Sequence, residues 1–307
     1  METVYSIVAS PNFKNDGICF AACQSGLYKS EDGGNRWYNA FDSLNPRKPL
    51  TTTSVAISPA FETDQTVFAA VGGAVLHSTD GGKKWEATVI SSPVPYISCL
   101  SISPGFEIDG FLIAGTLEDG VFISTDRGKH WKPCNFGLLD LNILCIDISS
   151  QFEKDETIYI GTESGIFISK NAGKAWKETN FPPEFGPILS ISLSPNYRED
   201  GTLFAGTESY GLFKSYNKGN EWIRLGENII SEGINSIILS STYFQKPEIL
   251  IASGQKLLIS YDDGKTWLTF KNNLQTEDEI ICVAAPQGLS EREPILLGLS
   301  KGGIIKV

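Results

Sequence analysis

Ser78-Thr-Asp-Gly-Gly-Lys-Lys-Trp85 is one of six segments that align without gaps and decide the fold. In each segment serine stands first, Asp or Asn third, glycine fifth and tryptophan eighth, and the first residues are Ser30, Ser78, Ser124, Ser169, Ser215 and Ser260. These serines are 48, 46, 45, 46 and 45 residues apart, and all six tryptophans of the chain end such a segment. So regular a spacing indicates a repeat protein with a unit of roughly 46 residues.

Two further motifs recur in each repeat. One is a hairpin of the form Ser194-Pro-Asn-Tyr-Arg-Glu-Asp-Gly-Thr202, with weaker or degenerate copies elsewhere, and the other is the stretch from Phe204 to Ser215. Apolar stretches between turn residues predict four short strands, which in this repeat are 188–194, 202–207, 211–215 and a strand that starts at Trp222. Four antiparallel strands at this period are typical of a propeller blade, whose two apolar faces only a ring of blades can bury.

The predicted fold is an all-β, seven-bladed β-propeller in one domain, 1–307. Innermost strands are expected near residues 4, 53, 97, 143, 188, 234 and 280, and helix should be nearly absent. The blades should cover approximately 1–48, 49–94, 95–140, 141–185, 186–231, 232–277 and 278–307. The last repeat ends at its third strand, so we expect a three-stranded last blade that closes the ring by packing against the first.

The six aligned segments, which we call the tryptophan turns, connect the third and fourth strands of a blade. The Asp or Asn side chain should accept hydrogen bonds from backbone N–H groups, glycine allows positive φ, and the indole packs between blades. These structural residues are Asp32, Asp80, Asp126, Asn171, Asn217 and Asp262, with Trp37, Trp85, Trp131, Trp176, Trp222 and Trp267. Because two turns lack the carboxylate, backbone capping is favoured over metal binding, and we expect neither a metal nor a cofactor.

The tryptophan turns and the whole repeat resemble the Asp-box, or BNR-repeat, propellers. That superfamily includes sialidases, xyloglucan-degrading glycosidases, sortilin-type receptors and photosystem II assembly and stability factors. The resemblance covers essentially the whole chain, and it implies architecture more than function, since the boxes lie away from the functional sites of these families. The assembly factors are closest in size, but they usually carry an export signal and a basic patch, neither of which we find, so we do not assign photosystem assembly.

Few residues favour an enzyme. The resemblance to sialidases would require three arginines on inner strands, and none of the six arginines falls on a predicted innermost strand. His77 on a strand and His130 in a tryptophan turn are more typical of packing or surface positions. A glycosidase would need two carboxylates across a cleft. The candidates are acids in loops between second and third strands, which are equally well explained as solvated turn charges: Glu118, Asp119, Glu163 and Glu208.

Charge and cysteine content limit the partners. A net charge of -11 disfavours nucleic acid and anionic lipid, and no apolar run of membrane-spanning length occurs, so we expect no membrane insertion. The six cysteines form no CxxC pair, which favours reduced, buried thiols and a cytoplasmic setting.

A candidate binding surface lies on the top face, which we define by the loops joining second to third strands and each fourth strand to the next repeat. Two consecutive loops of the second kind, 135–141 and 180–187, are apolar. The predicted surface comprises Phe136, Leu138, Leu139, Phe181, Phe185 and Tyr210, fringed by Glu163, Glu184 and Glu208. The alternative is that these rings fold inward and cap the blades.

Asp147 is a second candidate, because the other repeats place small or apolar residues at this innermost-strand position. A buried carboxylate must be hydrogen-bonded or neutralised, so a structural role and a channel-lining role both stay open. Together these patterns favour a non-enzymatic scaffold or assembly factor that binds a protein partner through the top face. The alternative function is a propeller that binds or hydrolyses glycans with top-face Glu and Asp residues.

Overall fold

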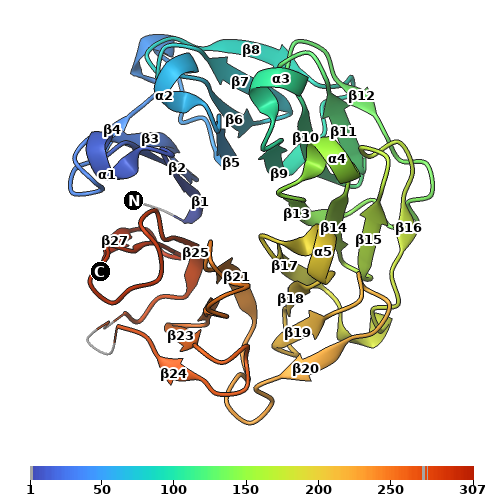
Figure 1. Ribbon diagram of the computed structural model, residues 1–307. Helices are drawn as coiled ribbons and strands as arrows, with labels where there is room; N and C mark the ends of the chain where they lie inside the picture. The colour runs from blue at the N-terminus through green and yellow to red at the C-terminus, as the bar shows by residue number, and fades with distance from the viewer. Residues whose placement is uncertain (1–2, 272–273, 275) are drawn as a thin grey trace.

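Seven antiparallel sheets stand around one axis, each forming one blade of a closed ring (Figure 1). The computed structural model describes residues 3–271, 274 and 276–307. Six sheets have four strands and the last has three, and neighbouring strands of every sheet follow one another in the chain. This is the predicted architecture, including the three-stranded last blade, and the two ends of the chain lie at adjacent blades (Figure 1).

Strands of equivalent position recur in every blade. The innermost strands are β1 (Val4–Ala9), β5 (Thr52–Ile57), β9 (Tyr96–Ile102), β13 (Ile143–Ile148), β17 (Ile188–Leu193), β21 (Ile234–Leu239) and β25 (Ile280–Ala284). The second strands are β2 (Cys19–Cys23), β6 (Val67–Val71), β10 (Leu112–Leu117), β14 (Ile158–Thr162), β18 (Leu203–Thr207), β22 (Ile249–Ser253) and β26 (Leu296–Leu299). The third strands are β3 (Gly26–Ser30), β7 (Ala74–Ser78), β11 (Val121–Ser124), β15 (Ile166–Ser169), β19 (Leu212–Ser215), β23 (Lys256–Ser260) and β27 (Ile304–Lys306). The short outer strands are β4 (Tyr38–Asn39), β8 (Glu86–Val89), β12 (Lys132–Pro133), β16 (Lys177–Glu178), β20 (Ile223–Leu225) and β24 (Leu268–Thr269).

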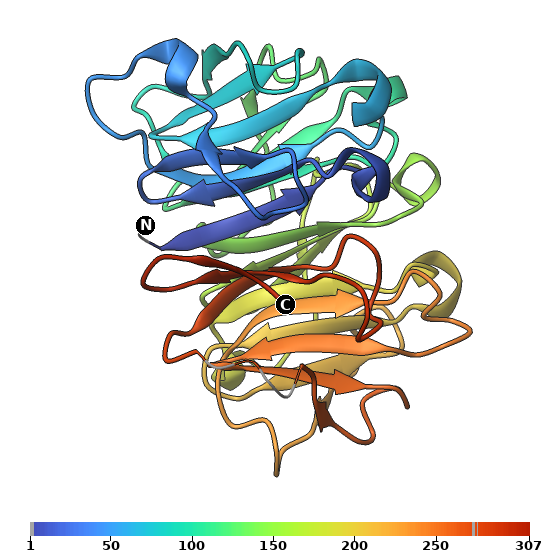
Figure 2. The same ribbon diagram turned by 90° about the vertical axis from the view of Figure 1, so that its left-hand side faces the viewer.

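The hairpins between first and second strands contain helical turns that the sequence analysis missed. They are α1 (Phe13–Asp16), α2 (Phe61–Asp64), α3 (Phe106–Asp109), α4 (Phe152–Asp155) and α5 (Tyr197–Asp200), and they gather along the right-hand side of the ring in Figure 2. In α5, Ser194 Oγ donates to Asp200 Oδ2 at 2.6 Å, and Asp200 Oδ1 accepts the N–H of Thr202 at 2.8 Å. One turn is too short to produce a helical periodicity, so the pattern reads as a loop. Two 3₁₀ turns, η1 (Asp42–Leu44) and η2 (Pro183–Phe185), lie in loops that lead to the next blade.

The tryptophan turns share one hydrogen-bond pattern. In the second turn Ser78 Oγ donates to Asp80 Oδ1 at 2.9 Å and accepts the N–H of Gly82, while Asp80 Oδ1 also accepts the N–H of Lys84. Gly82 has φ of 88°, a backbone conformation that favours glycine. Asn171 accepts the N–H of Ala175 at 3.0 Å through its amide oxygen, as the aspartates do. The turn therefore uses an acceptor oxygen and does not depend on a negative charge.

The hydrophobic core is divided among the blade interfaces. Seven clusters of buried side chains are present, and each combines residues of two consecutive blades. The cluster that closes the ring joins Val4 and Phe13 of the first blade to Leu296 of the last. The hydrophobic core therefore lies between blades rather than within them, and only a closed ring buries all of these interfaces.

Side chains of the innermost strands also bond to the next blade. Ser98 Oγ donates to the carbonyl oxygen of Ile143 at 2.5 Å, and Ser190 Oγ donates to that of Ile234 at 2.7 Å. At the closing seam Cys282 Sγ lies 3.7 Å from the carbonyl oxygen of Val4. The last blade thus docks on the first with the same type of contact, and no outer strand of the first blade is borrowed.

We predict that Trp85→Ala lowers the free energy of unfolding by about 3–5 kcal/mol, as for other buried aromatic truncations. The ring of Trp85 is buried against Phe41, and its indole N–H reaches the carbonyl oxygen of Ala40 at 2.9 Å. Denaturant unfolding measures the loss. The matched variant Trp131→Ala removes a more exposed ring, whose N–H bonds only within its own turn, so a smaller loss is expected. Equal losses in the two variants would contradict the role of the interface.

Candidate functional site

The loop from Asn135 to Asn142 carries the most exposed part of the predicted surface. Phe136 and Leu139 each expose 80% of their surface to solvent. The loop is nevertheless fixed, because Asp140 Oδ2 accepts bonds from the N–H and the hydroxyl of Ser164, at 2.9 and 2.8 Å. Two large apolar side chains are therefore held in solvent by a hydrogen-bonded loop rather than by a loose one.

Phe181 does not belong to an exposed surface, and the prediction that it does is wrong. Its ring is buried and makes edge contacts with Phe213 and Trp222, each at 5.1 Å between ring centroids. Phe185 is partly buried and rests on Phe213 and on Tyr210, which is 37% exposed. Phe181 therefore folds inward and caps the blade, whereas Tyr210 stays accessible to solvent.

The inward turn of Phe181 has a structural reason that recurs around the ring. In five blades the loop that leaves the outer strand places an apolar side chain in the same core cluster as the tryptophan of the next turn. Phe41 covers Trp85 in this way, and the other pairs that share a core cluster are Ile90 with Trp131, Leu138 with Trp176, Phe181 with Trp222 and Ile230 with Trp267. In the third blade Leu138 takes this place, which leaves Phe136 outside.

The acids of the predicted fringe are accessible to solvent in top-face loops. Glu163, Glu184 and Glu208 are exposed, as are Glu118 and Asp119. Glu163 Oε2 accepts a bond from Asn142 Nδ2 at 3.3 Å, which ties it to the fixed loop. Two top-face cavities are described, and their linings include a single acid, Glu277.

The two histidines occupy packing and surface positions. His77 stacks on Phe68 at 4.5 Å between ring centroids, and burial lowers its pKa. The His130 ring is exposed, and its Nδ1 lies 2.6 Å from Asp126 Oδ2 within the same tryptophan turn.

Asp147 bridges two blades. Its Oδ2 accepts the N–H of Leu193 on β17 at 2.7 Å, and its Oδ1 accepts the N–H of Ile148 at 3.0 Å. Burial raises its pKa from 3.8 to about 7, and these two N–H groups, which stabilise the carboxylate, partly oppose the shift. Both oxygens are engaged by backbone, so this arrangement favours the structural role.

A buried lysine outside the predicted surface is also structural. Lys214 Nζ is paired with Asp263 and lies 3.1 Å from the hydroxyl of Tyr243, so the cluster joins the fifth and sixth blades. Burial lowers the pKa of Lys214, while Asp263 opposes the shift. The Tyr243 hydroxyl donates to Asp263 as well, so the lysine, the aspartate and the tyrosine form one hydrogen-bonded cluster.

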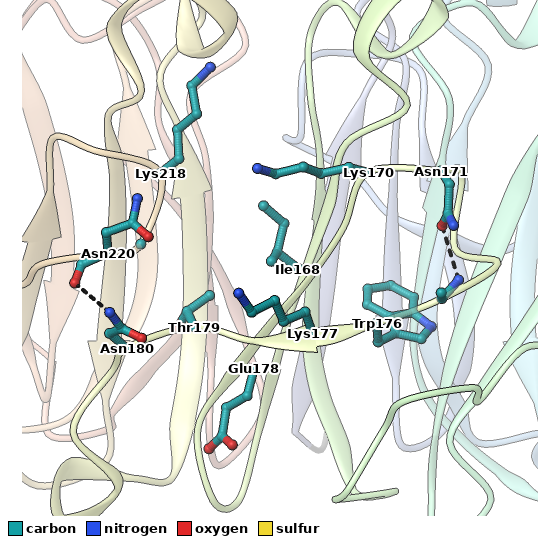
Figure 3. A pocket seen from close by; sticks show the side chains of 12 residues that line it. Ile168, Lys170, Asn171, Trp176, Lys177, Glu178, Thr179, Asn180, Lys218 and Asn220 are labelled. Atoms are coloured by element: carbon teal, nitrogen blue, oxygen red, sulfur yellow. Dashed lines mark hydrogen bonds between the residues drawn. The ribbon is translucent and has the colours of Figure 1, made fainter.

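Sequence reasoning missed a cavity of about 300 Å³ between the outer edges of the fourth and fifth blades. Its lining includes Lys170, Lys177 and Lys218, with Ile168 and Trp176 as apolar wall. In Figure 3, Lys170 and Lys177 extend from the fourth blade toward the fifth, and Ile168 lies between them. The lysines stand 7 and 41 residues apart in sequence, which is why no basic run signals the cavity.

The blade contact beneath this cavity is held by amides. Asn180 Nδ2 donates to the carbonyl oxygen of Asn220 at 3.1 Å (Figure 3). The backbone N–H of Asn180 donates to the carbonyl oxygen of Gly219 at 3.0 Å. The end of one outer strand is thereby fixed to the next tryptophan turn.

Comparison with known proteins identifies the fold alone. No protein-family model matches the sequence, and no curated protein matches it.

Among the described residues no helix is long and apolar enough to cross a membrane.

Solved structures of three kinds are similar over 99% of this chain. A GH74 xyloglucanase from Xanthomonas campestris has a TM-score of 0.75 at 16% identity, with 52% of its own length covered. YCF48 bound to D1 peptide has a TM-score of 0.73 at 16% identity, with 91% covered. The extracellular domain of the putative one-component system BT4673 from B. thetaiotaomicron has a TM-score of 0.73 at 16% identity, with 38% covered. This chain thus spans about half the length of the xyloglucanase, and these identities establish the propeller fold and nothing finer.

The raised pKa of Asp147 predicts a pH effect on stability. Between about pH 4 and pH 7 the folded state binds a proton that the unfolded state has released, so the unfolding free energy falls as pH rises through this range. Asp147→Asn cannot titrate, and its unfolding free energy should lack this contribution. Chemical denaturation of both proteins across this range tests the difference, and parallel pH profiles would contradict the raised pKa.

The opposite placement of two phenylalanines gives a second test. Phe181→Ser should lower the unfolding free energy by roughly 3–5 kcal/mol, because it empties a core site beneath Trp222 and buries a hydroxyl. Phe136→Ser should change it by less than about 0.5 kcal/mol, as expected for an exposed position. Thermal and urea unfolding compare the two. A neutral Phe181 variant would mean that this ring is not part of the core.

Proposed function

We propose that this chain is a non-enzymatic interaction scaffold that binds a protein partner through the fixed loop 135–142 and its surroundings. The observation that carries the proposal is the pair Phe136 and Leu139, each 80% exposed on a loop held by Asp140 and Ser164. Apolar side chains that are exposed and already ordered lose little entropy when a partner covers them. Leu141 on the same loop is 37% exposed, and Glu163, which is bonded to Asn142, provides a charged edge. Tyr210, 37% exposed and in contact with Phe185, and Glu208 lie in the top-face loop of the fifth blade.

The finer assignment is to the Asp-box propellers, and six tryptophan turns with one hydrogen-bond pattern support it. YCF48, whose structure was solved with D1 peptide bound, indicates that a similar ring of comparable length can bind a peptide. The six free cysteines are compatible with the cytoplasmic setting that we expect, although neighbours of this fold include extracellular domains. Glycan hydrolysis, the alternative, would need two carboxyl groups facing one cavity, and the linings of the two top-face cavities described above contain one acid, Glu277.

The test is a double variant, Phe136→Ser with Leu139→Ser, used as bait beside the intact wild-type chain in extracts of the source cells. We expect the variant to lose the proteins that the wild type retains while its melting temperature stays unchanged. Ile108→Ser is the matched control, since Ile108 is 86% exposed on α3, at the opposite face. Equal retention by the double variant, or release of sugars from xyloglucan by the wild type, would contradict the proposal.

A further inference from the structure

The cavity between the fourth and fifth blades is flanked by the two tryptophan turns that carry asparagine. Asn171 and Lys170 belong to one turn and Lys218 to the other, in which Asn217 replaces the usual aspartate. In the other four turns hydrogen bonds from backbone N–H groups help to hold the pKa of the aspartate below its usual value, so each contributes a negative charge. The two turns that lack this negative charge are therefore neighbours in the ring.

The amides preserve the fold of their turns. Asn171 Oδ1 accepts the hydroxyl of Ser169 at 2.9 Å, and Asn217 Oδ1 accepts the N–H of Glu221 at 2.9 Å, as the aspartates do elsewhere. Since the bonds that all six turns share are kept, the substitution alters the local electrostatic potential and leaves the turn intact. Its effect is therefore on what the cavity can bind.

The lysines of the cavity are available to a ligand. Neither Lys170 nor Lys177 forms an ion pair with any residue that the structure describes. Lys218 Nζ donates to the carbonyl oxygen of Arg198, a neutral acceptor that leaves its charge uncompensated. The lining contains a single carboxylate, Glu178, and Figure 3 shows it pointing away from the two lysines of the fourth blade.

A second cavity of about 370 Å³ adjoins the first and shares Lys170 and Lys218 with it. The lining of this cavity also includes Arg198 and two acids, Asp155 and Glu199. Asp155 is occupied in its own hairpin, where it bonds to Ser149 and Thr157. Together the two cavities are lined by four basic and three acidic side chains, so positive charge is in excess there, in a chain whose net charge is -11.

We propose that this cavity binds a small organic anion that carries two or more carboxylate groups. Separate ammonium groups on Lys170 and Lys177 act as point charges and suit separate carboxylates. Ile168 and the wall of Trp176 provide apolar contact, from which a carbon skeleton gains and an inorganic anion does not. A volume of about 300 Å³ matches the lower end of small-ligand pockets, which favours a metabolite-sized ligand over a peptide segment.

Isothermal titration of the full chain with citrate, at fixed ionic strength and neutral pH, tests the proposal. We expect saturable binding of one citrate per chain, which weakens as sodium chloride screens the lysines. Lys170→Gln and Lys177→Gln should each weaken binding by roughly fivefold, the size expected for one exposed charge contact. Absence of saturable binding, or binding that neither variant changes, would overturn the proposal.

Asn171→Asp provides the sharper variant. It restores the carboxylate that four other turns carry, so the melting temperature should stay unchanged while citrate affinity falls by roughly fivefold. Lys132→Gln is the matched control: Lys132 is exposed and directly follows the tryptophan of the third turn, as Lys177 follows that of the fourth, but lies in the blade that carries Asp126. This control should bind citrate like the wild type, and an equal loss there would mean nonspecific attraction.

Two competing probes decide the class of ligand. Succinate should bind more weakly than citrate, since it offers one carboxylate fewer, and inorganic phosphate should bind more weakly than either. Phosphate binding tighter than citrate binding would overturn the carboxylate assignment. Hexaglutamate binding tighter than citrate binding would replace the small ligand by an acidic peptide and equally contradict the proposal.

Discussion

Mutual coverage of neighbouring blades is the constraint on which the rest of this structure depends. Each core cluster takes its side chains from two blades, so a blade without neighbours would expose both faces of its sheet. The approach is close enough to dictate residues on the second strands. At Gly298 a Cβ atom would lie 2.7 Å from Cγ1 of Val4, and at Gly161 it would lie equally close to Ile188. The interface between the last and first blades thus packs as closely as an internal interface, and the ring closes without a shared outer strand.

Local sequence predicts the features that local chemistry produces. The turn residues and the strand pattern follow from hydrogen bonds and apolar spacing within one repeat, and the number of blades follows from the number of repeats. The helical turns escaped prediction because each is a single turn stabilised by a serine and an aspartate, with no periodic face. Phe136 and Phe181 show where local reasoning ends. Both stand five residues after a tryptophan, yet one is exposed and the other buried. In the third blade Leu138 is the loop residue that packs against the core cluster of the next tryptophan, and Phe136 is left in solvent.

The lysine-lined cavity could not have been found from spacing either. Lys170 and Lys177 come from one blade and Lys218 from the next, and they meet only because the end of β16 is fixed to the following tryptophan turn by Asn180. One signal was present in the sequence. The two turns with asparagine are consecutive, and both keep the bonds that all six turns share, so the exchange preserves the turn. The replacement of aspartate by asparagine therefore acts through charge. Because the two turns are neighbours in the ring, both replacements remove negative charge beside the same cavity.

A ring of near-identical blades acquires a distinct site wherever the repeat tolerates variation. The turn requires an acceptor at its third position and leaves the charge free, as Asp80 and Asn171 demonstrate with the same bonds. The loop to the next blade requires one apolar side chain over a tryptophan and leaves the others free, as Phe136 demonstrates. The proposed apolar surface and the proposed anion cavity both use such free positions. Because these free positions do not stabilise the ring, substitutions there should retain the fold. The two proposed sites can therefore be tested separately by substitution.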